Sequence, residues 1–183
     1  MKRSILAVAI TALALGGSAP LVAQQSGEAA PAAQRVRRIP RQELSGPRFG
    51  VTAFTGEIAD LRAKAGKEPF MTQVGWQFET RILDTPTGNQ ALLEWVILLG
   101  GLEQDEANLS LAGLAGYRLA NGVEFGVGPN LSSNKDNGDV TTSIVFAGGA
   151  TMPMGDIFIP LNLAVAVARG GPRITALVGW IVG

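Results

Sequence analysis

The chain has no cysteine and no histidine among its 183 residues. Without cysteine it has no disulfide bonds, no thiol nucleophile and no site for lipoprotein acylation. Without histidine it has no Ser-His-Asp triad, and the two absences together exclude zinc sites of the usual kind. We therefore predict no catalytic residues, no metal site and no cofactor.

Charged residues are also scarce. They make up 16% of the chain, against about 25% in typical soluble proteins, while glycine is frequent at 24 residues. The 15 basic and 15 acidic residues balance, and there is no long basic run, so we expect no nucleic-acid partner. The shortage of charge indicates that something other than water covers part of the surface.

The N-terminus has the three zones of a secretory signal peptide. A basic start precedes an apolar stretch from Ile5 to Leu15, and helix-breaking and small residues follow as far as Ala23. We predict a signal peptide over 1–23. The stretch 24–45 contains two prolines, many small residues and no apolar periodicity, so we expect it to be a disordered leader before a single domain over 46–183.

Beyond residue 46 the hydropathy alternates with a period of two, as in β-strands, whose successive side chains point to opposite faces. In the clearest segment, Val74 and Trp76 lie on one face and Gln73 and Glu79 on the other. Turn residues separate the segments. Eight segments follow this pattern: 47–55, 69–82, 90–100, 109–119, 122–131, 140–152, 156–168 and 172–182.

An even number of antiparallel strands can close into a barrel, because the first strand then pairs antiparallel with the last and the sheet has no exposed edge. One face of the eight segments is apolar and free of charge. The opposite face combines glycine, alanine and asparagine with all the charges that fall in strands. These charged residues are Arg48, Glu79, Arg81, Glu94, Arg118, Glu124 and Arg173.

Two architectures fit this alternation, and they place the apolar face on opposite sides. A soluble lipocalin-like barrel keeps it inside, whereas a membrane barrel turns it toward lipid. The many small residues of the polar face favour the narrow lumen of a membrane barrel. Strands of about ten residues, tilted by about 40°, also give the roughly 25 Å height of an outer-membrane apolar band. We therefore predict an all-β fold, an eight-stranded antiparallel up-and-down transmembrane β-barrel.

The connections between segments alternate in length. Those after the second, fourth and sixth segments are mostly short, whereas the connections over 56–68, 101–108 and 132–139 are longer and carry more charge. In strand count, alternation and loop asymmetry, the region 46–183 resembles the small eight-stranded outer-membrane barrels of the OmpX and OmpA-transmembrane-domain type. The resemblance implies a bacterial outer-membrane location, contact with membrane lipid and insertion by the barrel-assembly machinery.

Six of the inward-facing charges gather toward the expected periplasmic half of the barrel. Three are basic and three are acidic, and buried charges are tolerated when they are paired, so we expect ion pairs that bridge and plug the lumen. This structural cluster comprises Arg48, Glu79, Arg81, Glu94, Arg118 and Glu124. We expect single substitutions such as Glu94→Gln to lower thermal stability, and we expect little conductance through the barrel.

The function expected from the sequence is that of a non-enzymatic integral outer-membrane protein, porin-like in fold, with a structural, adhesive or small-solute role. An enzyme is disfavoured because a membrane hydrolase or acyltransferase usually needs a histidine base. One alternative stays open. A soluble periplasmic lipocalin-like barrel that holds an apolar ligand would show the same alternation.

Overall fold

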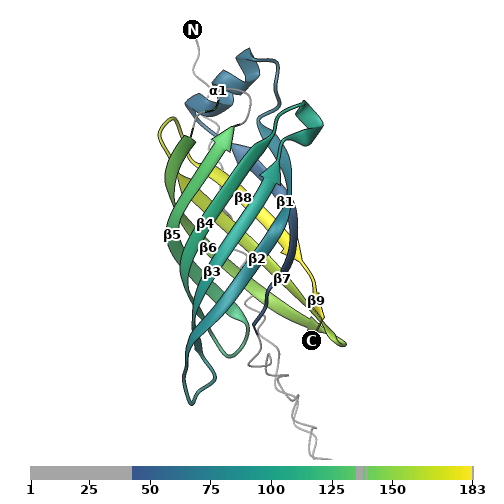
Figure 1. The fold of residues 1–183 in the computed structure, drawn as a ribbon, viewed down its shortest axis with the longest axis vertical. Coiled ribbons are helices and arrows are strands. Elements are labelled where there is room, and N and C mark those ends of the chain that lie inside the picture. Colours follow the sequence, from purple (N-terminus) through teal and green to yellow (C-terminus); the bar gives the residue numbers. More distant parts are fainter. Residues whose placement is uncertain (1–42, 135–137, 139, 183) are drawn as a thin grey trace, which may run out of the picture. The chain divides into compact units, whose positions relative to one another are not determined.

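A computed structural model describes residues 43–134, 138 and 140–182, and over these residues the chain forms a closed β-barrel. The predicted signal peptide, 1–23, and the predicted leader as far as residue 42 lie outside the described residues. Figure 1 shows the strands tilted across the long axis of the barrel, with α1 at one end and β9 at the other.

The strands follow the eight predicted segments closely. They are β1 (Gly46–Phe54), β2 (Phe70–Asp84), β3 (Gln90–Gly100), β4 (Asn108–Arg118), β5 (Val123–Asn134), β6 (Val140–Met154), β7 (Ile157–Val167), β8 (Arg173–Gly179) and β9 (Ile181–Val182). A break at Trp180 separates β8 from β9, and both pair with β7, so together they form the eighth strand. The prediction of an eight-stranded antiparallel up-and-down barrel is confirmed.

Pairing between the first and last strands closes the sheet. Strands adjacent in sequence pair antiparallel from β1 to β8, and β1 pairs antiparallel with β8, with Phe49 opposite Val178. A shift of register between Arg81 and Leu83 marks a bulge in β2. Closure leaves no edge strand in the described barrel, so its backbone donors and acceptors are satisfied within the sheet.

The two faces of the sheet are sorted as the alternation predicts, and the apolar face points outward. Each of the eight strands exposes large apolar side chains on the outside. Examples in chain order are Val51, Trp76, Ile97, Leu111, Phe125, Phe146, Leu163 and Val178. Two segments, 90–100 and 140–152, are apolar on both faces, and there the structure turns Val96, Leu98 and Val145 inward.

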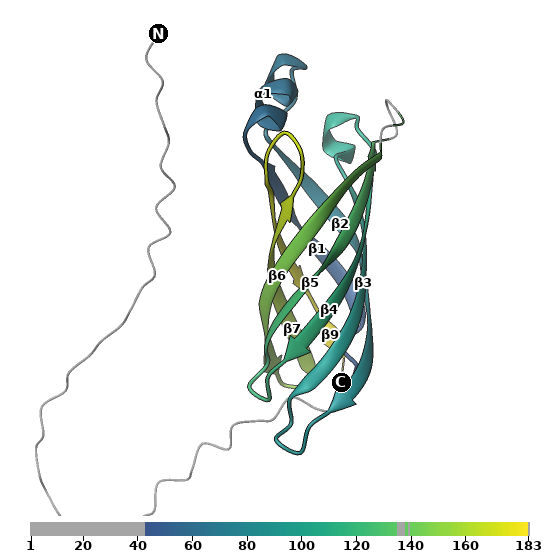
Figure 2. The same ribbon diagram turned by 90° about the vertical axis from the view of Figure 1, so that its left-hand side faces the viewer.

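The two ends of the barrel differ in their connections, as Figure 2 shows. At one end, which we call the loop end, lie the helices α1 (Glu57–Lys64) and η1 (Leu102–Gln104). At the opposite end, the turn end, short turns join β2 to β3, β4 to β5 and β6 to β7. No helix of the described residues is long and apolar enough to cross a membrane.

Candidate functional site

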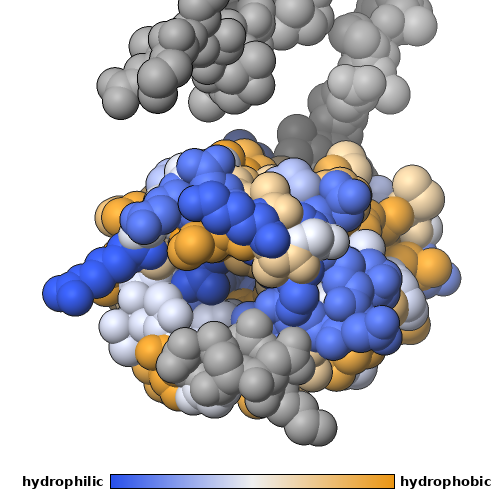
Figure 3. Space-filling view, turned by 90° about the horizontal axis from the view of Figure 1, so that it is seen from above, coloured by the Kyte–Doolittle hydropathy of each residue, from blue (hydrophilic) through white to orange (hydrophobic). Residues whose placement is uncertain are grey.

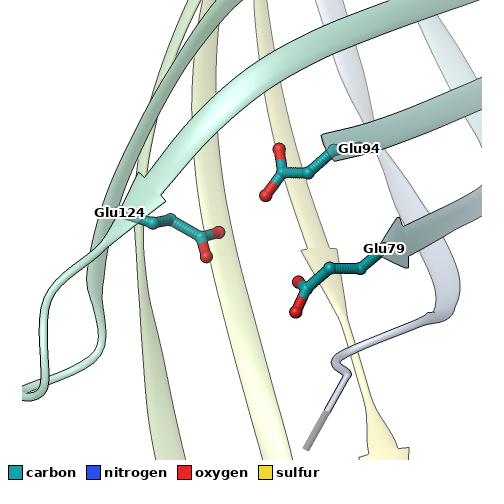
Figure 4. A group of neighbouring side chains, drawn as sticks. All are labelled: Glu79, Glu94 and Glu124. Carbon is teal, nitrogen blue, oxygen red and sulfur yellow. The ribbon is translucent and has the colours of Figure 1, made fainter. Parts of the chain in front are cut away.

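Five buried charged side chains occupy the turn-end half of the lumen, and we call them the lumen charge cluster. They are Arg48, Glu79, Glu94, Arg118 and Glu124, one from each of β1 to β5. Each occupies an inward position of the two-residue alternation, which is why strands far apart in sequence bring them together. In Figure 4 the carboxylates of the three glutamates point toward one another from β2, β3 and β5.

Arg118 holds this cluster together. Its Nη1 donates to Glu79 Oε1 at 2.7 Å, and its Nε donates to Glu124 Oε2 at 2.8 Å. Its Nη2 donates to both carboxylates. Glu124 also accepts a hydrogen bond of 2.6 Å from Asn162 Nδ2 on β7. Charge-assisted bonds of this kind are about twice as strong as neutral ones, so one guanidinium ties β4 to β2 and β5, and Glu124 extends the link to β7.

Arg48 has a different role, because it bonds to uncharged side-chain and backbone groups at the turn end. Its Nε donates to Gln77 Oε1 at 3.0 Å, and its Nη2 donates to the carbonyl oxygen of Leu44 at 3.3 Å. The amide of Leu44 in turn donates to Glu79 Oε1 at 3.2 Å. Leu44 is completely buried and packs with Phe158 and Ile181. The predicted leader, 24–45, therefore ends with residues that lie inside the barrel.

Glu94 is the member of the cluster without a guanidinium contact. Its carboxylate accepts no hydrogen bond from a described residue, and its nearest acidic neighbours are Glu79 and Glu124, with ligand oxygens within 4.8 Å of one another. Three carboxylates at this spacing have the geometry of a cation site. Arg118 already occupies two of them, however, so the group is better described as a structural ion-pair cluster, and we assign no metal to it.

The sixth predicted member, Arg81, lies two residues beyond Glu79 in β2 and forms an ion pair with Asp84. Its Nε is 3.1 Å from Asp84 Oδ2, and both side chains are half-buried near the end of β2. The bulge between Arg81 and Leu83 changes the register there. Arg81 itself pairs with Leu92 before the bulge and keeps the inward parity of Glu79, which is why the alternation alone placed it with the other five.

An apolar layer fills the lumen on the loop-end side of the charge cluster. We call it the inner apolar belt: Val96, Leu98, Ala112, Leu114 and Val145 are buried in it, and Ala147, Ala164, Ala166 and Leu177 pack against them. The sequence pattern placed only the four alanines of this belt on the polar face, because they are small. The belt residues occupy inward positions of the two-residue alternation, as the glutamates do, and this pattern could have revealed the belt.

A layer of hydroxyl and amide groups lies beyond the inner apolar belt, toward the loop end. Ser110 Oγ donates to Asn130 Oδ1 at 2.7 Å, and Asn130 Nδ2 donates to Ser143 Oγ at 3.3 Å. Ser132 Oγ donates to Asn108 Oδ1 at 2.9 Å. These groups satisfy one another across neighbouring strands, so the interior has three layers along its axis: charged, apolar and neutral polar.

A second buried arginine network joins the connections at the loop end. Arg62 of α1 stacks on the ring of Phe54 at 4.3 Å and forms an ion pair of 2.8 Å with Glu106. It also donates to Gln104 Oε1 at 3.0 Å and to the carbonyl oxygen of Glu68 at 2.9 Å. Sequence analysis missed this network because its members lie in loops, where no periodicity relates distant residues.

Glu103 fixes the same connection to β2. Desolvation raises the pKa of its carboxyl group, but hydrogen bonds from the amide and hydroxyl of Thr72 outweigh this effect and hold the pKa below its ordinary value. These two bonds measure 2.6 and 2.7 Å. The loop that contains η1 is therefore tied both to α1 and to the barrel wall.

The geometry of the lumen charge cluster changes the stability effect that we expect for Glu94→Gln. Glu94 lies near two carboxylates and has no described hydrogen-bond donor, so neutralising it removes repulsion and should leave the free energy of unfolding unchanged or slightly raised. The matched variant Glu124→Gln weakens contacts to Arg118 and Asn162 and should lower that free energy by about 3 kcal/mol. Urea unfolding in detergent micelles measures both. Equal losses from the two substitutions would contradict this arrangement.

Comparisons with family models, with curated proteins and with solved structures find no match for this chain. Two features of the barrel carry most information about function: the charges held inside and the apolar residues turned outside.

Proposed function

We propose that this protein is an integral β-barrel of a bacterial outer membrane, without enzymatic activity, and that its closed lumen serves a structural, adhesive or small-solute role. The observation that carries the proposal is the continuous apolar outer face, to which all eight strands contribute. The predicted signal peptide supports export.

The outer face is difficult to reconcile with water as its surroundings. Leu163 and Phe146 are each 56% exposed, and similar residues surround the barrel. Soluble monomers rarely expose a contiguous apolar patch larger than about 300–600 Å², and leaving apolar area in water costs about 25 cal/mol per Å². Lipid acyl chains remove that cost, which supports membrane lipid as the partner of this face.

The interior supports the same orientation. A lipocalin-like carrier of an apolar ligand needs an apolar pocket of about 300–1,000 Å³. Here the lumen contains the charge cluster and the neutral polar layer, and the cavity between them measures about 80 Å³. A soluble barrel would therefore have its apolar and polar faces reversed, so we do not favour this alternative.

The two ends fit the two sides of an outer membrane. At the turn end, Phe49 stacks on Trp180 with 5.2 Å between ring centroids, and the rings of Tyr117 and Phe125 are 6.1 Å apart. Aromatic side chains favour the headgroup level. Hydrophilic side chains gather over the loop end, which Figure 3 views from above. We therefore assign the turn end to the periplasm and propose insertion by the barrel-assembly machinery.

Leu163→Arg tests the membrane assignment most sharply among single substitutions. Leu163 is exposed midway along β7, and an arginine facing lipid near the bilayer midplane costs about 2–4 kcal/mol. We expect the variant to lose that much unfolding free energy in phospholipid vesicles.

In cells, the wild-type protein should remain with the outer membrane after a salt wash and should migrate faster on gels when unboiled.

The matched control is Leu102→Arg, since Leu102 is equally exposed but lies in η1 beyond the strands. It should leave stability and fractionation unchanged. A soluble barrel would tolerate both substitutions alike and would be released by salt alone, and either result would overturn the proposal.

A closed lumen predicts little electrical conductance. Arg118 and its two carboxylates cross the interior, and Leu44, Phe158 and Ile181 pack at its turn end. Purified protein in planar bilayers should therefore show no steady current above the bilayer background. A large steady pore current would refute the closed lumen while leaving the membrane location intact.

A further inference from the structure

Arg173, at the start of β8, is a buried arginine without a partner. The residue is 8% exposed, and its Nε and Nη2 nitrogens are enclosed yet donate to no described atom. Arg48, Arg62 and Arg118 are buried as well, but each of them donates at least three hydrogen bonds. A buried guanidinium without an acceptor is unfavourable, so Arg173 is the interior group best suited to receive an anion.

The internal cavity of about 80 Å³ lies against Arg173. The inner apolar belt lines its sides, including Val96, Val145 and Leu177, and Glu94 lies among the residues that line it on the side of the charge cluster. An occupant of this space therefore meets a cation toward the loop end, apolar side chains along its length and a carboxylate toward the turn end.

Neighbouring polar side chains do not supply the missing acceptor. Thr52 Oγ1 lies 2.6 Å from Thr175 Oγ1 and donates to Gln73 Oε1 at 2.7 Å. These groups also line the cavity, but they bond to one another and not to Arg173. The guanidinium is therefore available to a molecule that enters the lumen.

We propose that this cavity binds a short-chain monocarboxylate of the size of acetate or propionate. A guanidinium presents its donors in a planar fork that matches a carboxylate, and the short alkyl group lies against the inner apolar belt. A cavity of about 150 Å³ accommodates benzene, so one near half that size takes about three to five non-hydrogen atoms. A second carboxylate would approach Glu94, which selects against dicarboxylates.

This inference depends on the geometry of the lumen and not on the location of the protein. Its failure would leave the outer apolar face, and the membrane assignment drawn from it, unaffected. Conversely, release of the protein by salt would not change the contents of the cavity. The two proposals can therefore fail separately.

The test is calorimetric titration of the full chain, refolded in detergent micelles, with sodium propionate at constant ionic strength. We expect saturable binding at one site. Arg173→Gln should weaken it about tenfold or more, because the carboxylate loses its charged partner. The matched control is Arg169→Gln, which removes an exposed arginine of the neighbouring loop and should leave the affinity unchanged.

Two further probes vary the ligand. Succinate should bind about tenfold more weakly than propionate because its second carboxylate meets Glu94, and Glu94→Gln should reduce this difference. Sodium chloride should compete poorly because chloride has no apolar part. Absence of saturable propionate binding up to about 100 mM, undiminished binding by Arg173→Gln, or competition by chloride as effective as by propionate would each overturn the proposal.

Discussion

Closure of the sheet by β1 and β8 is the constraint on which the rest of this structure depends. An apolar outer face cannot surround an open sheet, because edge strands would carry unpaired backbone groups into the same apolar medium. Antiparallel pairing of β1 with β8 removes both edges at once. The eight strands then enclose a narrow interior, and the alternation of side chains decides what enters it.

The interior follows from this narrowness. A charge turned inward is stabilised by a partner within reach, and Arg118 bonds to two glutamates from different strands. Small and aliphatic residues fill the next layer, and hydroxyl and amide groups bond to one another beyond it. Among the inward charges of the described residues, Glu94 and Arg173 are left without a hydrogen bond, and both line the same cavity. The proposed ligand site thus lies where two buried charged groups of the interior have no hydrogen-bond partner.

The sequence predicted the fold well because a period of two is a local signal that survives in every strand. It also predicted which glutamates and arginines share the lumen, because every second residue of a strand faces inward. Examples are Glu79, Glu94, Arg118 and Glu124. It could not predict which charges pair. That depends on the direction in which Arg118 extends across the barrel and on the position of Asp84, which pairs with Arg81.

Other features have no periodic signal at all. Arg62 meets Glu106 across two loops separated by two strands, and loop conformation determines that contact. Leu44 lies at the barrel end because Arg48 and Glu79 bond to its backbone. The residues before the first strand show no alternation of hydropathy from which this position could be predicted. Packing and hydrogen bonding between distant residues determine these positions, and the sequence pattern does not reveal such contacts.

Tryptophan fluorescence gives the most direct test of the central claim, that the outer face of the barrel contacts lipid. The chain has three tryptophans, Trp76, Trp95 and Trp180, and all three face outward with 45%, 45% and 50% exposure. For the protein reconstituted in vesicles of brominated phospholipid, the account predicts strong quenching by the bromine atoms and little quenching by aqueous iodide. Strong quenching by iodide with none from the brominated lipid would contradict it.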